Sequence, residues 1–178
     1  MLELYTDRLR LRTMKRNDMQ HFLQVHQDPS INQFISVSGS ESDILEKFEH
    51  KLSPWTFDSG DWLTLTIEEI SSDRFIGFTG LYCSNLALRH AEVGYMLALE
   101  GQGKGYATES LKAVIDWGCL SCNVHKFIGT CSTGNLASVR VLEKAGFTLE
   151  GVLRHNFKID ERWIDDNVYG LLSEERSL

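Results

Sequence analysis

Hydrophobic and polar positions alternate strongly near the start of the chain. Charged residues and leucines take turns over Arg8–Arg12, which is the pattern of a half-buried strand. Apolar residues then recur at helical spacing after Asn17, which we expect to cap a helix that ends near Asp28–Pro29. A second helix is expected over residues 41–52 for the same reason.

The middle of the chain has the period of two that is typical of strands. Alternation and β-branched residues predict strands over Trp62–Ile67, Arg74–Tyr82 and Ala91–Ala98. A polar turn at 68–73 joins the first two, so these three strands form an antiparallel meander.

The second half of the chain alternates helices with strands. We expect, in order, a helix from Ala107, a strand over His125–Cys131, a helix over Leu136–Ala145, and two closing strands over Phe147–Phe157 and Arg162–Leu172. All these elements together predict an α/β (α+β) fold, with a mixed, mostly antiparallel sheet of about six to seven strands and helices on both faces.

Composition adds limits to this picture. The 178 residues, 42% of them hydrophobic, suit one domain over 1–178 with a structured core over approximately 6–173. Neither a long apolar stretch nor a signal peptide within Met1–Arg12 is visible, so we expect a cytoplasmic protein that does not span a membrane.

The net charge of −7 and the absence of a basic stripe argue against nucleic-acid binding. That charge keeps the protein soluble, and it also favours a cationic amine substrate.

Four cysteines occur, and two of them have a spacing that metal sites use. Cys119 and Cys122 form a Cys-x-x-Cys pair, but no second pair and no suitable histidine follows. We therefore expect core thiols in a reducing compartment and no metal site.

The segment Gly101–Glu109 carries the strongest chemical signal. It is rich in glycine, follows a strand and opens an amphipathic helix. The first turn of a helix has unpaired N–H groups and a positive dipole end, and glycines let the backbone approach an anion closely. The segment therefore predicts a phosphate site, or else a plain glycine-rich helix cap.

Two motifs make the resemblance specific. The pattern Gln102-x-x-Gly105-x-Ala107 resembles the coenzyme A motif of the GNAT acetyltransferase superfamily, and Asn135–Phe147 is similar to that family's second cofactor segment. Thr6–Arg12 and Arg162–Asp165 resemble the ribosomal-protein N-terminal acetyltransferase subgroup. The resemblance covers almost the whole chain, and it implies the acyl-CoA N-acyltransferase fold.

The resemblance also implies which residues hold acetyl-CoA. Backbone amides of one loop would hold the pyrophosphate: Gln102, Gly103, Lys104, Gly105, Tyr106, Ala107 and Thr108. Backbone groups of one strand would pair with the pantetheine arm where two strands part: Met96, Leu97 and Ala98. Asn135 would hydrogen-bond the cofactor, cap its helix, or do both.

The catalytic candidates follow from what acyl transfer to an amine requires. Glu92 shares a strand face with Gly94 and Met96, so it is our candidate for the base that deprotonates the amine. The alternative is a structural or substrate-binding carboxylate. Many GNAT enzymes use a tyrosine to protonate the thiolate, but Leu142 occupies that position. Ser138 is the substitute that we consider, with a plain helix-surface role as the alternative.

Other residues are weaker candidates. Tyr95, His90 and His155 are more simply explained as packing or surface residues. Asp165 and Asp166, with Asp160 and Glu161 in the last turn, can receive a cationic amine or be solvated. Trp55, Trp62 and Trp163 can line an acceptor pocket, with core packing as the default role.

Three functions remain open from the sequence. The first is acetylation of a protein or peptide N-terminal α-amine. The second is acetylation of a small amine such as a polyamine, an amino acid or an antibiotic, and the third is a non-catalytic acyl-CoA sensor. We expect a monomer or a homodimer whose partners are acyl-CoA and an amine acceptor.

Overall fold

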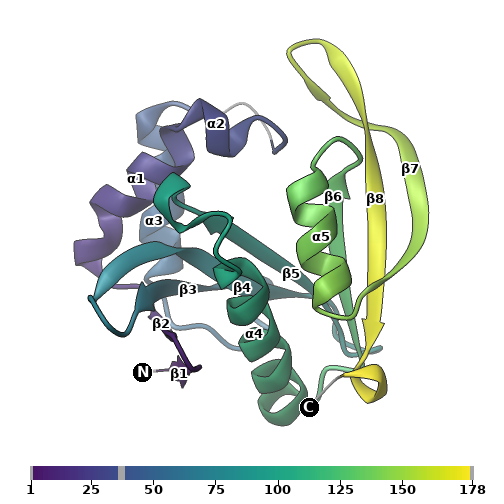
Figure 1. The fold of residues 1–178 in the computed structure, drawn as a ribbon, viewed down its shortest axis with the longest axis horizontal. Coiled ribbons are helices and arrows are strands. Elements are labelled where there is room, and N and C mark those ends of the chain that lie inside the picture. Colours follow the sequence, from purple (N-terminus) through teal and green to yellow (C-terminus); the bar gives the residue numbers. More distant parts are fainter. Residues whose placement is uncertain (1, 36–38, 177–178) are drawn as a thin grey trace.

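A single eight-stranded sheet forms the frame of the protein, of which the computed structural model describes residues 2–35 and 39–176. The strands lie in the order β1-β2-β3-β4-β5-β6-β8-β7, and within the described residues only β5 and β6 pair in parallel (Figure 1). The strands are β1 (Glu3–Tyr5), β2 (Leu9–Thr13), β3 (Trp62–Glu69), β4 (Arg74–Asn85), β5 (His90–Leu97), β6 (Lys126–Ser132), β7 (Thr148–Ile159) and β8 (Arg162–Leu172). The helices are α1 (Met19–Gln27), α2 (Pro29–Asn32), α3 (Glu41–Lys51), α4 (Tyr106–Cys122) and α5 (Leu136–Lys144), with short 3₁₀ helices η1 (Arg16–Asp18), η2 (Leu99–Gly101) and η3 (Ser173–Glu175).

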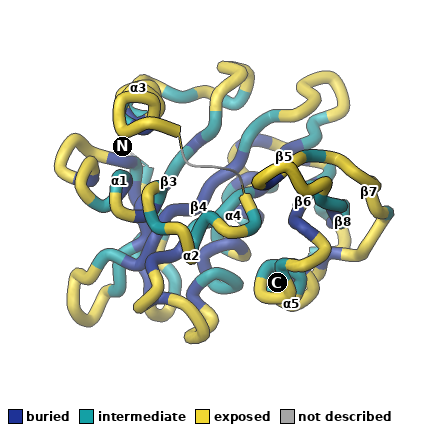
Figure 2. The backbone as a smooth tube through the Cα atoms, turned by 90° about the horizontal axis from the view of Figure 1, so that it is seen from above, coloured by how far each residue is buried: buried dark blue, intermediate teal, exposed yellow. Residues whose placement is uncertain are grey.

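The sheet carries a hydrophobic core on each face. One core lies against α4 and α5 and includes Leu65 and Leu142. The other lies against α1 and α3 and includes Phe22 and Phe48, whose ring centroids are 5.4 Å apart. Figure 2 shows the buried segments along the central strands, with exposed segments around them. The helices therefore cover both faces of a mixed sheet, and the predicted fold class is confirmed.

The first strand is the one that the hydrophobic pattern did not reveal. β1 has three residues, which is too short to show alternation. It pairs with β2 and makes the eighth strand, so the sheet has one strand more than the six to seven that were predicted.

The predicted cap of α1 was wrong. Asn17 lies inside η1, and Asp18 occupies the N-cap position without capping the helix. The carboxylate of Asp18 instead accepts hydrogen bonds from Arg12 and from the hydroxyl of Thr66. The same carboxylate accepts from the Lys15 N–H at 2.7 Å, so the helical turns begin with η1 and Asn17 falls inside them.

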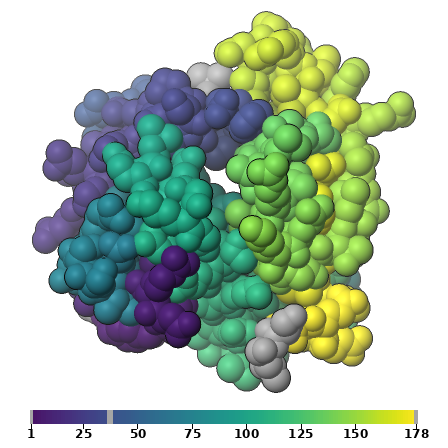
Figure 3. Space-filling view, in the orientation of Figure 1, coloured from purple at the N-terminus to yellow at the C-terminus, as the bar shows by residue number. Residues whose placement is uncertain are grey.

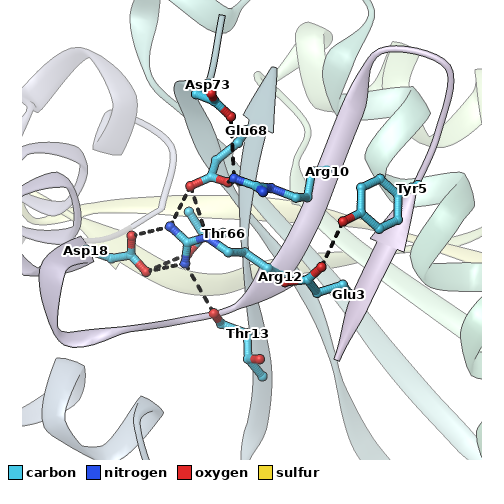
Figure 4. Close-up of polar contacts among 9 residues, drawn as sticks. All are labelled: Glu3, Tyr5, Arg10, Arg12, Thr13, Asp18, Thr66, Glu68 and Asp73. Atoms are coloured by element: carbon cyan, nitrogen blue, oxygen red, sulfur yellow. Dashed lines mark hydrogen bonds and ion pairs between the residues drawn. The ribbon is translucent and has the colours of Figure 1, made fainter. Parts of the chain in front are cut away.

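The ion pair of Asp18 with Arg12 belongs to a buried cluster, which is drawn in Figure 4. The Arg12 guanidinium lies between Asp18 at 2.8 Å and Glu68 at 2.6 Å, and Arg10 contacts Glu68 at 2.7 Å. Burial alone would raise the pKa of both carboxyls, but the hydrogen bonds from arginine lower the pKa of Asp18 and of Glu68 below their ordinary values. The cluster ties β2 and β3 to the start of α1.

Two further expectations concern the membrane and the thiols. In the part of the chain that the structure describes, no helix combines the length and apolar character needed to cross a membrane. All four cysteines are free: Cys122 and Cys131 are buried, while Cys83 and Cys119 are half-buried.

Candidate functional site

The parallel pair β5–β6 opens into a gap partway along its length. The two strands pair at His90, Ala91 and Glu92, and the last pair joins Glu92 to Ile128. From Val93 onward β5 pairs only with β4, while β6 pairs with β8. Because successive strand residues direct their backbone N–H and C=O groups alternately to the two neighbouring strands, every second residue of β5 beyond Glu92 directs these groups to the gap.

A cleft of about 730 Å³ passes through the sheet at this gap. Its walls come from both faces, because it is lined by Phe22 and Trp62 on the α1 side and by Ser138 and Leu142 on the α5 side. The space-filling view in Figure 3 shows a hollow between the body of the protein and α5, with α1–α2 and the β7–β8 hairpin at its upper rim. A ligand in the cleft can therefore be reached from two sides of the sheet.

The glycine-rich loop follows β5 and η2 and leads directly into α4. Gly103 and Gly105 have φ angles of 74° and 82°, a left-handed conformation that glycine adopts without strain. The first backbone hydrogen bond of the helix runs from the Glu109 N–H to the Gly105 carbonyl, 3.1 Å away. The N–H groups of Tyr106, Ala107 and Thr108 precede that bond and have no partner within the helix, which is the arrangement that binds anions at helix starts.

The back of this loop is held by Arg8 of the segment before β2. Arg8 donates to the Lys104 carbonyl at 3.1 Å, pairs with Glu109 at 2.6 Å and lies over the Tyr106 ring. The Tyr106 side chain is buried and its hydroxyl donates to Glu69, so only its backbone is left for a ligand. The loop is thus supported from behind, while Gln102, Gly103, Lys104 and Gly105 are exposed.

The structure uses some of the predicted cofactor groups within the chain itself. The Ala98 N–H donates to the Ile76 carbonyl at 2.9 Å, so it is not free for the pantetheine arm. The Gln102 N–H donates to Leu99, and its side-chain amide donates to the Leu97 carbonyl at 3.1 Å. Gln102 therefore shapes the loop. Met96 lines the cleft, but its carbonyl lies against Gly77 of β4, so the Leu97 N–H is the best placed backbone group of the predicted strand residues.

Asn135 caps α5 and also lines the cleft. Its side-chain oxygen accepts from the Ser138 N–H at 3.1 Å, which confirms the cap. Because an asparagine amide has two further donors on its nitrogen, a ligand contact is compatible with the cap.

Glu92 lies at the apex of the gap, where β5 and β6 part. Its half-buried carboxyl lines the cleft together with Gly94 and Met96, as the strand alternation predicted. Burial raises the pKa of Glu92, which moves a carboxylate toward the range needed for a base near neutral pH. Trp62 covers Gly94 so closely that an added Cβ would lie 3.0 Å from the indole ring.

Ser138 lies on α5 across the gap from β5. The hydroxyl of Tyr95 is 2.7 Å from its Oγ and 3.2 Å from its carbonyl oxygen. Leu142, at the position of the family's tyrosine, is buried against Gly129 and has only apolar side-chain atoms to offer. Tyr95 is thus the phenol that reaches Ser138, although it comes from a strand and not from the helix.

Most of the weaker candidates lie outside the cleft. Trp62 lines the cleft, but Trp163 is 54% exposed and stacks on His155 outside it. Trp55 packs between Phe57 and Trp117, and His90 stacks on His125. Leu136, the first residue of α5, is 61% exposed.

The four acidic residues that were candidates in the last hairpin are divided between solvent and cleft. Asp160 and Glu161 are exposed in the turn, where both have positive φ angles. Asp165 accepts from the His155 N–H, whereas Asp166 is buried, lines the cleft and accepts from Asn156 at 2.7 Å. Asp166 is therefore the acid of this group that a ligand in the cleft can meet.

Sequence reasoning missed much of the wall opposite α5. This wall comes from α1, the segment after α2, the end of α3, and β4: Phe22, His26, Phe34, Ile35, Lys51 and Phe78. Apolar spacing identified Phe22 as a core residue of α1, but spacing alone does not separate a core side chain from a cleft wall. The tertiary packing of α1 against β4 makes the difference.

Comparison with known proteins agrees with this geometry. The family profile described as "Acetyltransferase (GNAT) domain" matches residues 8–148. The chain is 31% identical over 170 residues to the probable N-acetyltransferase YjcK of Bacillus subtilis, covering 95% of this chain and 88% of that one. It is 26% identical over 160 residues to the spermidine N(1)-acetyltransferase of Escherichia coli, covering 87% and 81%.

A solved structure has the same fold. The spermidine N-acetyltransferase of Vibrio cholerae, in complex with CoA and spermine, superposes with a TM-score of 0.83 at 24% identity, covering 96% of this chain and 98% of that one. These relatives do not establish the ribosomal-protein N-terminal subgroup that the two terminal motifs suggested, since those with a named acceptor act on spermidine. With a family match over most of its length and a matching fold, the chain belongs to the GNAT acetyltransferase family, and it is an N-acyltransferase that takes acetyl-CoA as its acyl donor.

Proposed function

We propose that this enzyme acetylates the primary amine of a small molecule, with the reaction centred where β5 and β6 part. The observation that carries the proposal is a cleft of about 730 Å³ that crosses the sheet at the gap with a half-buried carboxyl at its apex. A volume of this size is typical of small-ligand sites. Because the cleft must admit both the acyl end of the cofactor and the acceptor, a small amine fits it better than a polypeptide.

The cofactor is held by three groups in this proposal. The N–H groups of the segment Gly103–Thr108 bind the pyrophosphate at the start of α4. The Leu97 N–H, which strand alternation directs to the open side of β5, pairs with the pantetheine arm. Asn135 donates from its side-chain nitrogen while its oxygen caps α5.

The acceptor enters from the α1 side of the sheet. Phe22, Phe78 and Trp62 provide apolar walls there for the carbon chain of the amine. Glu92 and Asp166 are the residues with carboxyl groups in the lining, and Lys51 and Lys158 are its lysines. The likeness to spermidine acetyltransferases supports a small amine, and the mixed charges leave room for acceptors of more than one charge type.

Glu92 is the base in this mechanism. An amine is protonated near neutral pH, so it must lose a proton before its nitrogen can attack. Glu92 accepts this proton directly or through one water, which its raised pKa favours. Most of the remaining acceleration comes from holding the two reactants in one cleft.

Ser138 supplies the proton for the leaving group. The acetyl-CoA thioester provides an activated acyl group. The attacking nitrogen forms a bond to the acyl carbon as the carbon–sulfur bond breaks, and the electron pair of that bond goes to sulfur. Ser138 gives its proton to the sulfur, and the second proton that the nitrogen loses as it becomes an amide returns through water to Ser138.

A panel of acceptors tests the proposal. Release of free thiol from acetyl-CoA is measured with spermidine, a diamine, several amino acids, and peptides with free or blocked N-termini. We expect the highest kcat/KM with a small primary amine and no release with blocked peptides. A preference for free peptide N-termini would favour the competing N-terminal acceptor. Binding of acetyl-CoA without turnover for every amine would favour the acyl-CoA sensor.

A further inference from the structure

One hydrogen bond links the two walls of the gap. The Tyr95 hydroxyl, from β5, is 2.7 Å from Ser138 Oγ and 3.2 Å from the Ser138 carbonyl oxygen, on α5. β5 and β6 do not pair beyond Glu92, so this contact spans the gap three residues past the apex. Both residues line the cleft.

The chemistry of the two hydroxyl groups limits how they can share protons. Burial raises the pKa of Tyr95 well above the ordinary value of a phenol, so the group stays protonated at any working pH. A phenol has one proton, and the Ser138 carbonyl can only accept. When Tyr95 donates to Ser138 Oγ, the serine keeps its own proton for another partner.

The groups around Ser138 indicate that the acceptor of its hydroxyl proton lies in the cleft. Its N–H is used by the Asn135 cap, and the Cys131 thiol lies beside its hydroxyl. Burial raises the pKa of Cys131 to about 11, so this neighbour is a neutral thiol and a weak acceptor. Asp166 also lines the cleft and accepts from Asn156, but among the described residues no hydrogen bond joins it to Ser138.

We propose that Tyr95 is a positioning residue, whose phenol donates to Ser138 Oγ and turns the serine proton toward the sulfur of the cofactor. This inference rests on the proposed role of Ser138. Tyr95 keeps its proton throughout the reaction: the serine proton goes to sulfur, and the proton that the nitrogen loses on amide formation replaces it through water. In the place of a helical tyrosine that would protonate sulfur directly, this chain has a serine oriented by a tyrosine of the neighbouring strand.

A double-mutant cycle tests the inference. Kinetic constants are measured for Tyr95→Phe, Ser138→Ala and the double variant, with cooperative thermal unfolding checked for each. We expect Tyr95→Phe to lower kcat by roughly tenfold to a hundredfold, as a misplaced reacting group does, with little change in KM for acetyl-CoA. Because Tyr95 acts only through Ser138, adding Tyr95→Phe to Ser138→Ala should cause no further loss.

The pH profile separates positioning from acid catalysis. If Tyr95 only orients Ser138, the alkaline limb of kcat keeps its position in Tyr95→Phe. Tyr82→Phe is the matched control: Tyr82 lies on β4 opposite Glu92, stacks on Trp62, and should keep full activity when it loses its hydroxyl.

Three results would overturn the inference. One is unchanged kcat in Tyr95→Phe, or a change in KM alone. Another is a full multiplicative loss when Tyr95→Phe is added to Ser138→Ala, which would give Tyr95 a separate role while leaving the role of Ser138 intact. The third is full activity in Ser138→Ala, which would remove the proposed proton donor and the inference with it.

Discussion

Glu92 combines three properties that a base for amine acetylation needs. It is the last residue of β5 that pairs with β6, it lines the cleft, and its pKa is raised by burial. A carboxylate accepts a proton only when ionised, so activity should be lost as pH falls through this raised pKa and regained above it.

Replacing this carboxyl gives a direct prediction. Glu92→Gln should lower kcat by about a hundredfold or more, because the amide cannot take the proton from the amine. The fall in kcat at low pH that is due to protonation of Glu92 should disappear, which leaves only the pH dependence due to protonation of the amine substrate. Glu46→Gln, an exposed change on α3, is the control and should leave the profile unchanged. A Glu92→Gln profile equal to that of the unaltered protein would show that Glu92 is not the base.

At the residue level, sequence reasoning identified residues of the cleft, but it did not identify which side chains contact each other there. The strand period placed Glu92, Gly94 and Met96 on one face, and all three line the cleft. The same period puts Tyr95 on the opposite face. Its contact with Ser138 depends on how α5 lies over the gap, which no local pattern encodes.

Glycine conformation at the start of α4 determines the shape of the cofactor loop. Gly103→Ala should raise the Kd for acetyl-CoA roughly tenfold, since a left-handed alanine is strained by about 1–2 kcal/mol and the loop relaxes away from its anion-binding shape. Calorimetric titration measures the change.

Gly60 offers a matched control for this variant. Its φ is 76° against 74° for Gly103, and a Cβ added at either glycine has no atom within 4 Å. Gly60→Ala should therefore carry similar backbone strain without any effect on cofactor binding. Equal Kd values for the two variants would contradict the assignment of the loop.

The buried cluster of Arg12, Asp18 and Glu68 should stabilise the start of α1, whose Phe22 lines the cleft. Asp18→Asn removes one charge and should lower the free energy of unfolding by about 3 kcal/mol, the lower end for breaking a buried pair because Glu68 remains. Urea unfolding at neutral pH measures this loss. Asp73→Asn, at the exposed end of the same cluster, should change stability little.

The cluster also predicts how stability depends on pH. The pKa values of Asp18 and Glu68 are lowered in the folded state, so their contribution is present above the ordinary carboxyl pKa of about 4 and is lost as pH falls below it. The loss should be shallower in Asp18→Asn. An identical acid dependence in the two proteins would show that the cluster does not stabilise the fold.

Elements with long, regular patterns were predictable, and short or tertiary ones were not. The range of β8 matched the prediction at both ends, and α5 ends one residue early, before the left-handed Gly146. β1 was too short to recognise. The cap at Asn17 failed because the helical turns begin earlier, with η1, where the Asp18 carboxylate accepts from the Lys15 N–H as well as from Arg12.

For the molecule as a whole, the order of strands creates the site. α4 carries the chain from β5 to a parallel neighbour, β6, and β8 then pairs with the other side of β6. This arrangement leaves β5 and β6 free to part, so that a cofactor at the start of α4 and an acceptor from the α1 side can meet within the sheet. The motifs predicted the cofactor, but the acceptor depends on walls that come from distant segments.

The most direct measurement is a competition for acetyl groups in one reaction. Spermidine, an amino acid and a peptide with a free N-terminus are supplied at equal concentration with acetyl-CoA, and mass spectrometry counts the acetylated products against the thiol released. We predict that the acetylated small amines account for the thiol and that the peptide is left almost unmodified. Acetylated peptide as the main product, or thiol without any acetylated amine, would contradict the assignment of the cleft to a small primary amine.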